Sequence, residues 1–129
     1  MGLLEQIYEK AKENPQRIAF PEAVNEKMMQ AAYETGKEGY IIPVLVGYAD
    51  EIFIVSIVVE TIFDRWTDTQ VDIREETYKK KLIDRYVALP QTLLKEKALN
   101  RRMQNPLYYA MVMEAVGEAD VTFAGIDNT

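Results

Sequence analysis

The sequence contains neither cysteine nor histidine. Without cysteine it has no disulfide, thiolate zinc site or cysteine nucleophile, which fits a reducing cytoplasm. Without histidine it lacks the commonest general base and the commonest ligand of transition metals. The sequence therefore gives no support to a metal centre, and we expect no bound cofactor.

Glycine-rich nucleotide-binding motifs are missing as well. The stretch RIAFPEAVNE, which holds the first expected strand and the residues after it, contains no glycine. Rossmann and P-loop sites are therefore excluded, because both need glycines where the strand ends. A receiver-type domain would need paired acids after this strand, where only Glu22 is present.

Basic charge and long apolar runs are scarce. Lys and Arg number 15 against 21 Asp and Glu, and the net charge of −6 opposes nucleic acid and anionic membranes as partners. The basic runs Lys79–Lys81 and Arg101–Arg102 are predicted to be solvated helix faces; contact of the arginine pair with a phosphorylated ligand is the less favoured alternative. The longest apolar run, Ile52–Val59, is too short to span a membrane, and the acid-containing N-terminus is not a signal peptide.

The chain has 129 residues, 48% of them hydrophobic and 28% charged, which is typical of a globular protein. We expect one α/β domain spanning residues 1–129, long enough for a real core. Apolar residues at helical spacing, with cap residues, predict helices at 3–13, 24–40, 75–89, 91–104 and 105–117. Apolar runs bounded by turn residues predict strands at 17–21, 40–47, 69–73 and 120–125.

Local signals sharpen two of these expectations. Asn25 is a predicted N-cap, and Gly39 is predicted to end the same helix. Pro43 cannot donate to a sheet ladder, so residues 40–42 are expected to approach a strand that pairs over 44–46.

The last helix has its own start signal and a predicted buried side. Asn105 is the expected N-cap, with Pro106 at the first helical position. The stripe predicted to be buried consists of Tyr108, Met111, Val112 and Ala115.

Residues 50–64 give conflicting signals. Many of them are β-branched, which favours a strand. However, the segment shows no period-two alternation, its first residues are acidic, and Ser56, Glu60 and Asp64 recur every four residues. We favour a helix with these three side chains on one face.

Strands that alternate with helices predict a three-layer αβα fold with a mostly parallel, doubly wound sheet. The sheet is expected to be incomplete, because the sequence ends directly after a strand. An open sheet edge and exposed apolar surface favour self-association, so we expect a homo-oligomer.

The loop AGIDNT follows the last expected strand. Ligands bind where strands end in open α/β sheets, and Gly125 lets backbone approach a ligand closely. Asn128 and Thr129 add polar groups, as does Asp127. A plain turn is the alternative, because the same residue types favour turns.

Two segments carry a resemblance to a known family. The stretch LLEQIYEKAKENPQRIAFPEAVNEKMMQAA, followed by IPVLVG, resembles the opening of phosphate acetyl/butyryltransferases. The stretch NPLYYAMVMEAVGEADVTFAGIDNT is similar to another recognisable part of that family. The acetyl-specific branch usually has an Arg and a Lys-Gly pair soon after a Tyr, whereas Tyr86 is followed here by VALPQTLLKEK. Acetyl-, butyryl- and ethanolamine-utilisation-type relatives therefore remain open.

The resemblance implies a reversible reaction in which acyl-CoA and phosphate give acyl phosphate and coenzyme A. In this family the thiol of coenzyme A attacks the acyl phosphate, so the substrate supplies the nucleophile. The family's base and charge-stabilising residues lie in its C-terminal half, so we expect a fragment that is inactive alone and assign no catalytic residue. The resemblance implies that one edge of the substrate site is formed by the loop residues Gly125, Asn128 and Thr129.

Two other functions remain open. The chain could be a non-catalytic α/β module of the same ancestry that binds a ligand or associates with itself. It could also be an unrelated α/β domain with another ligand.

Overall fold

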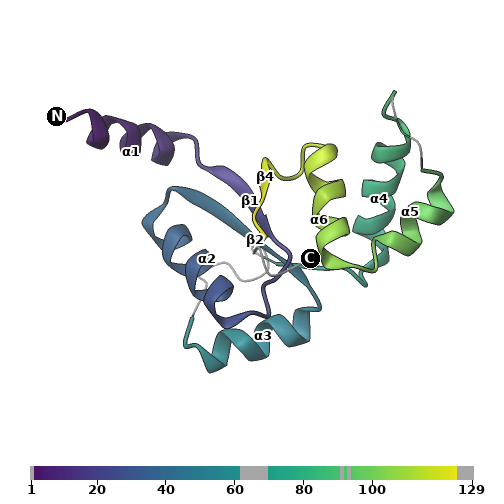
Figure 1. The fold of residues 1–129 in the computed structure, drawn as a ribbon, viewed down its shortest axis with the longest axis horizontal. Coiled ribbons are helices and arrows are strands. Elements are labelled where there is room, and N and C mark those ends of the chain that lie inside the picture. Colours follow the sequence, from purple (N-terminus) through teal and green to yellow (C-terminus); the bar gives the residue numbers. More distant parts are fainter. Residues whose placement is uncertain (1, 62–69, 91, 93, 125–129) are drawn as a thin grey trace.

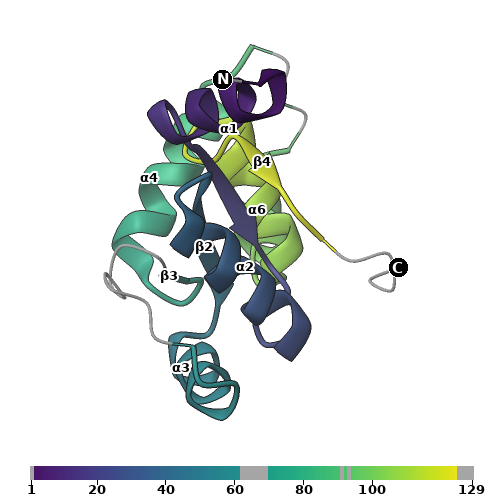
Figure 2. The same cartoon turned by 90° about the vertical axis from the view of Figure 1, so that its left-hand side faces the viewer.

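The computed structural model describes residues 2–61, 70–90, 92 and 94–124. Its centre is a parallel sheet in the order β3-β2-β1-β4, flanked by helices on both faces (Figures 1 and 2). The predicted three-layer αβα fold is thus confirmed. The strands are β1 (Gln16–Phe20), β2 (Ile41–Gly47), β3 (Gln70–Asp72) and β4 (Val121–Thr122). The helices are α1 (Leu3–Glu13), α2 (Glu26–Glu38), α3 (Ala49–Val58), α4 (Glu76–Val87), α5 (Glu96–Arg102) and α6 (Pro106–Ala115).

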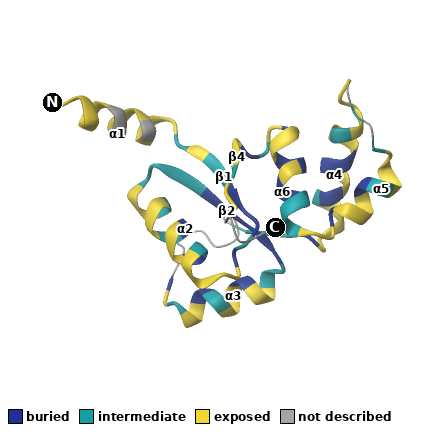
Figure 3. Cartoon of the chain, viewed as in Figure 1, coloured by how far each residue is buried: buried dark blue, intermediate teal, exposed yellow. Residues whose placement is uncertain are grey.

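Each face of the sheet has its own hydrophobic core, because successive side chains of a strand point to opposite faces. Val44 and Val46 of β2 pack with α4, α5 and α6, whereas Leu45 between them packs with α2 and α3. In Figure 3 the buried residues gather along the strands and on the helices beside them. The side chains of α1 that are described are all exposed, and this helix extends away from the sheet (Figure 1).

The register corrects the expectation about Pro43. Ile41 and Ile42 are paired with β1, opposite Gln16 and Arg17, and are not an unpaired approach. The proline is tolerated because β3 joins β2 only from Leu45 onward. Among the described residues, β2 therefore has a strand on one side only at the point where the missing N–H would matter.

The predicted helix signals of α2 and α6 are confirmed. The Asn25 side chain accepts hydrogen bonds from the N–H groups of Lys27 and Met28, at 3.0 and 3.1 Å. Gly39 ends α2 in the left-handed conformation with φ of 87°, which glycine adopts without strain. Pro106 begins α6 after the Asn105 cap.

The helix favoured for residues 50–64 is confirmed as far as Val58, where α3 ends. The expected polar face is wrong. The Ser56 side chain is buried and its hydroxyl donates to the Phe53 carbonyl at 2.6 Å, while Glu60 lies beyond the helix in a turn with φ of 58°. Asp64 lies outside the described residues. The helix is apolar on nearly every side, so its sequence does not set which side faces the core.

Two further expectations need correction. The helix expected over 91–104 begins only at Glu96. In α6 the predicted stripe is displaced by one residue, because Met111 and Ala115 are exposed. The side chains of α6 that are buried are Tyr109, Ala110, Val112 and Met113.

Candidate functional site

The strand order places a topological switch point beside β1. The chain crosses from β1 to β2 on one side, and β4 pairs with β1 on the other. In open α/β sheets, ligands bind outside the carboxyl ends of the strands at such a point. A hollow of about 470 Å³ lies there, which we call the switch-point pocket; it is lined by Pro21, Glu22, Val24, Asn25, Asn105, Pro106 and Leu107.

Two helices begin at the switch-point pocket. Asn25 caps α2, and Asn105 caps α6 by accepting a hydrogen bond of 2.8 Å from the N–H of Leu107. The first N–H groups of a helix and its dipole favour negative charge at the N-terminus. The two N-termini contribute partial positive charge to the pocket, and the Glu22 carboxylate in the same lining contributes negative charge.

Two more hollows lie in succession beyond this pocket, and each shares a lining residue with the one before it. One, of about 590 Å³, shares Asn105 with the switch-point pocket and is otherwise lined by Arg101, Arg102, Gln104 and Tyr108. The other, of about 360 Å³, shares Gln104 with the second and lies at the ends of β2 and β3. We call this third hollow the Lys79 pocket; its lining residues are Tyr48, Ile73, Arg74, Glu76, Lys79 and Gln104.

Basic side chains gather along these hollows although the chain is acidic overall. Arg101 and Arg102 are exposed, as predicted, and the Arg102 guanidinium lies 5.7 Å from the centre of the Tyr108 ring. The prediction for the lysine run is wrong at one position. Lys80 and Lys81 are exposed, but Lys79 is only 6% exposed.

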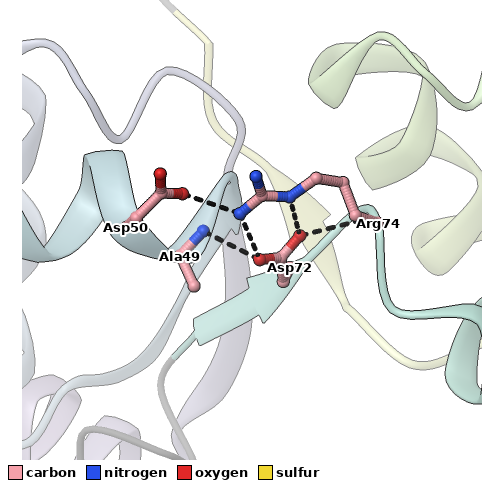
Figure 4. Close-up of polar contacts among 4 residues, drawn as sticks. All are labelled: Ala49, Asp50, Asp72 and Arg74. Carbon is pink, nitrogen blue, oxygen red and sulfur yellow. Dashed lines mark hydrogen bonds and ion pairs between the residues drawn. The ribbon is translucent and has the colours of Figure 1, made fainter.

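Arg74 joins the end of β3 to the beginning of α3 (Figure 4). Its guanidinium contacts Asp72 at 2.8 and 3.0 Å and Asp50 at 2.6 Å, while Asp72 also accepts a bond of 3.1 Å from the Ala49 N–H. The hydrogen bond from Arg74 lowers the pKa of Asp72 to about 2. Asp72 is therefore a permanently ionised structural anchor at neutral pH, and not a general base.

The sequence-predicted site residues Gly125, Asn128 and Thr129 lie outside the described residues, and so does Asp127. The structure does describe where their loop begins. The Phe123 N–H donates to the Ala19 carbonyl at 2.9 Å, and the rings of Phe20 and Phe123 are 5.8 Å apart. The last described residues thus lie beside the carboxyl end of β1, and the role assigned to the loop stays a prediction.

The sequence did not predict that Asn25 and Asn105 line the same pocket. Each asparagine was recognisable as a helix cap, but only the strand order places β1 next to β4. The described residues form no group of acids that could hold a metal ion. The described helices also include none that is both long and apolar enough to cross a bilayer.

Comparison with known proteins gives consistent matches. The family model for phosphate acetyl/butaryl transferase matches residues 2–129. A phosphate acetyltransferase of Acetivibrio thermocellus is 30% identical over 129 residues, which are 100% of this chain and 38% of that protein.

Two solved structures have the same fold. A phosphotransacetylase from Streptococcus pyogenes superposes with a TM-score of 0.81 at 18% identity, covering 100% of this chain and 40% of its own. The EutD phosphotransacetylase from Staphylococcus aureus gives 0.80 at 18% identity, covering 98% and 38%. This chain therefore spans about two-fifths of the length of these relatives. The chain belongs to the phosphate acetyl/butaryl transferase family.

Proposed function

We propose that this chain forms part of a phosphate acyltransferase, which interconverts acyl-CoA plus phosphate with acyl phosphate plus coenzyme A. The observation that carries the proposal is the switch-point pocket, where two helix N-termini favour an anion at the carboxyl edge of the sheet. Coenzyme A and phosphate are the small-molecule substrates, by analogy with the relatives. The loop with Gly125, Asn128 and Thr129 is proposed to border this pocket.

The 129-residue chain by itself is proposed to have no turnover. The reaction requires a group that takes the thiol proton at neutral pH. The sequence offers no histidine or cysteine, and the pKa of Asp72 is far too low for this task. The chain thus contributes pocket and scaffold, and the remaining catalytic groups belong to other parts of the complete acyltransferase.

A chimaera tests the proposal. The matching segment of the Acetivibrio thermocellus enzyme is replaced by this chain, and phosphate-dependent release of coenzyme A from acetyl-CoA and butyryl-CoA is measured. We expect activity in the chimaera and none in the 129-residue chain. A folded chimaera without turnover would overturn the proposal. Turnover by the 129-residue chain would contradict the proposal that it is inactive alone.

Matched variants test whether the switch-point pocket takes part in the reaction. Leu107→Glu puts a carboxylate in the pocket and should abolish turnover by repelling anions, whereas Met111→Glu adds the same charge on the exposed side of α6. Equal losses in both variants would contradict this placement.

We also propose an oligomeric state and a cellular location for the chain. We expect a homo-oligomer in the cytoplasm, because α3 presents large apolar side chains to solvent and the sequence lacks cysteine. A binding or self-association module without chemistry is the second candidate. It is supported if coenzyme A binds to the chain but the folded chimaera has no turnover.

A further inference from the structure

Positive charge is concentrated on α4 and α5, although the chain as a whole is acidic. Residues 76–102 hold eight of the 15 Lys and Arg residues but three of the 21 Asp and Glu residues. This segment therefore carries a net charge of +5, and the rest of the chain carries −11. Of the eight basic side chains, Lys79 is buried and Arg85 is paired with Glu118. The other six are exposed, and we call them the basic face: Lys80, Lys81, Lys95, Lys97, Arg101 and Arg102.

Most of the basic face receives no counter-charge from this chain. Lys80 pairs with Asp84 at 3.5 Å, and the Arg102 guanidinium lies over the Tyr108 ring. The other four side chains make no ion pair with any residue that the structure describes. The two helices contact each other on one face of the sheet (Figure 1), so their charges add to one local field. Such a field favours a negatively charged partner.

The surroundings of the basic face indicate what kind of partner this is. Val87 and Leu89, at the end of α4, are 40% and 36% exposed, and a protein segment has apolar side chains that can cover them, whereas a phosphate backbone has none. A long nucleic acid or a membrane would also meet the acidic remainder of the chain, which repels it. A short acidic segment contacts the basic face alone. The observations therefore favour a protein partner.

We infer that the basic face is a docking surface for an acidic segment of a partner protein. Lys97 and Arg101 are four residues apart, so they lie on the same side of α5 and can bind neighbouring carboxylates of the segment. An arginine can hold a carboxylate through two parallel hydrogen bonds, which adds specificity to the attraction. Apolar side chains of the segment cover Val87 and Leu89. The inference does not depend on acyl transfer.

Fluorescence anisotropy with a short labelled peptide of glutamate and leucine tests the surface on the 129-residue chain. Lys97→Glu combined with Arg101→Glu reverses two charges of the basic face. Lys27→Glu combined with Lys37→Glu is the control, because it changes the net charge equally at exposed positions of α2, which packs on the other face of the sheet. We expect the α5 variant to weaken binding about tenfold or more, and the α2 variant to change it less than about threefold.

Two further measurements keep the result decisive if the α5 variant does not fold. Lys81→Gln removes one exposed charge and should weaken binding about threefold, and a peptide with glutamine in place of glutamate should bind the wild-type chain about tenfold more weakly. The inference is overturned if the acidic peptide does not bind the wild-type chain, or if the two double variants lose affinity equally. It is also overturned if Lys81→Gln and the glutamine peptide both leave binding unchanged. Tighter binding of duplex DNA or of phosphatidylserine vesicles than of the acidic peptide would contradict it as well, and would point to a nucleic acid or a membrane.

Discussion

Asp120 and Arg17 fasten the beginning of β4 to β1. The Asp120 carboxylate accepts a hydrogen bond of 2.8 Å from the Arg17 N–H, and the Asp120 N–H donates to the Arg17 carbonyl at the same distance. The Arg17 side chain adds a third bond, to the Glu118 carbonyl at 2.9 Å. These contacts position β4 at the switch point, where two residue pairs join it to β1 in the part of the chain that the structure describes.

Asp120→Ala should lower the free energy of unfolding by about 1 kcal/mol, because it removes the side-chain half of this connection at an exposed site. Urea denaturation measures the change. Asp84→Ala is the control, since the one partner of the Asp84 side chain among the described residues is the exposed Lys80. Equal effects of the two substitutions would show that Asp120 does not anchor β4.

Acid should weaken the Asp72–Arg74 connection. The pKa of Asp72 is about 2 in the folded chain, below its usual value of 3.8, so the ionised carboxylate stabilises the fold above about pH 4. This contribution is lost as pH falls from about 4 through 2, when the carboxylate is protonated. Since half of the Arg74 side chain is exposed, we expect it to be on the order of 1 kcal/mol.

Comparison of the wild type with Asp72→Asn isolates this contribution from the other acids. The variant should be less stable at pH 6, and the difference in unfolding free energy should shrink as pH falls below 4. A difference that stays constant from neutral to acid pH would contradict the assignment.

The buried side of α6 can be tested with two methionines. Met113 is fully buried and Met111 is 53% exposed. Met113→Ala should cost about 2–5 kcal/mol because it leaves a cavity, whereas Met111→Ala should stay within about 0.5 kcal/mol. Urea denaturation of both variants decides between the observed stripe and the one expected from the sequence, which would reverse the order.

The sequence predicted element types well because caps and breakers act locally. Asn25, Gly39 and Asn105 determine helix ends through contacts a few residues away. Which side of α3 or α6 is buried depends on the sheet, because both helices are apolar nearly all round. The burial of Lys79 and the pairing of Arg74 with Asp50 likewise need residues that only the fold brings together.

Self-association through α3 is the next expectation. Its exposed side carries Ile54, Ile57 and Val58, each at least 60% exposed, together with the half-exposed Phe53. Ile57→Lys should lower the association constant about tenfold, since a buried isoleucine contributes more than 1 kcal/mol. Light scattering over a range of concentrations measures this. Thr35→Lys adds the same charge at an exposed position of α2 and serves as the control. A wild-type chain that stays monomeric at high concentration would refute the expectation.

Gly36→Ala should lower the stability of the fold, whereas glycine-to-alanine at an ordinary helix position raises it. Glycine-to-alanine in a helix interior normally stabilises by about 1 kcal/mol. At Gly36, however, an added Cβ would lie 2.9 Å from Cγ of Pro43 and 3.0 Å from Cδ, closer than van der Waals contact allows. The rigid proline ring cannot turn aside, so α2 has to move away from β2, and we expect the free energy of unfolding to fall by about 1–3 kcal/mol.

In a Pro43→Ala background the same substitution should become neutral or stabilising, because the proline ring that the added Cβ meets is gone. A destabilisation of the same size in both backgrounds, measured by urea denaturation, would show that the close approach of α2 to Pro43 is not the cause.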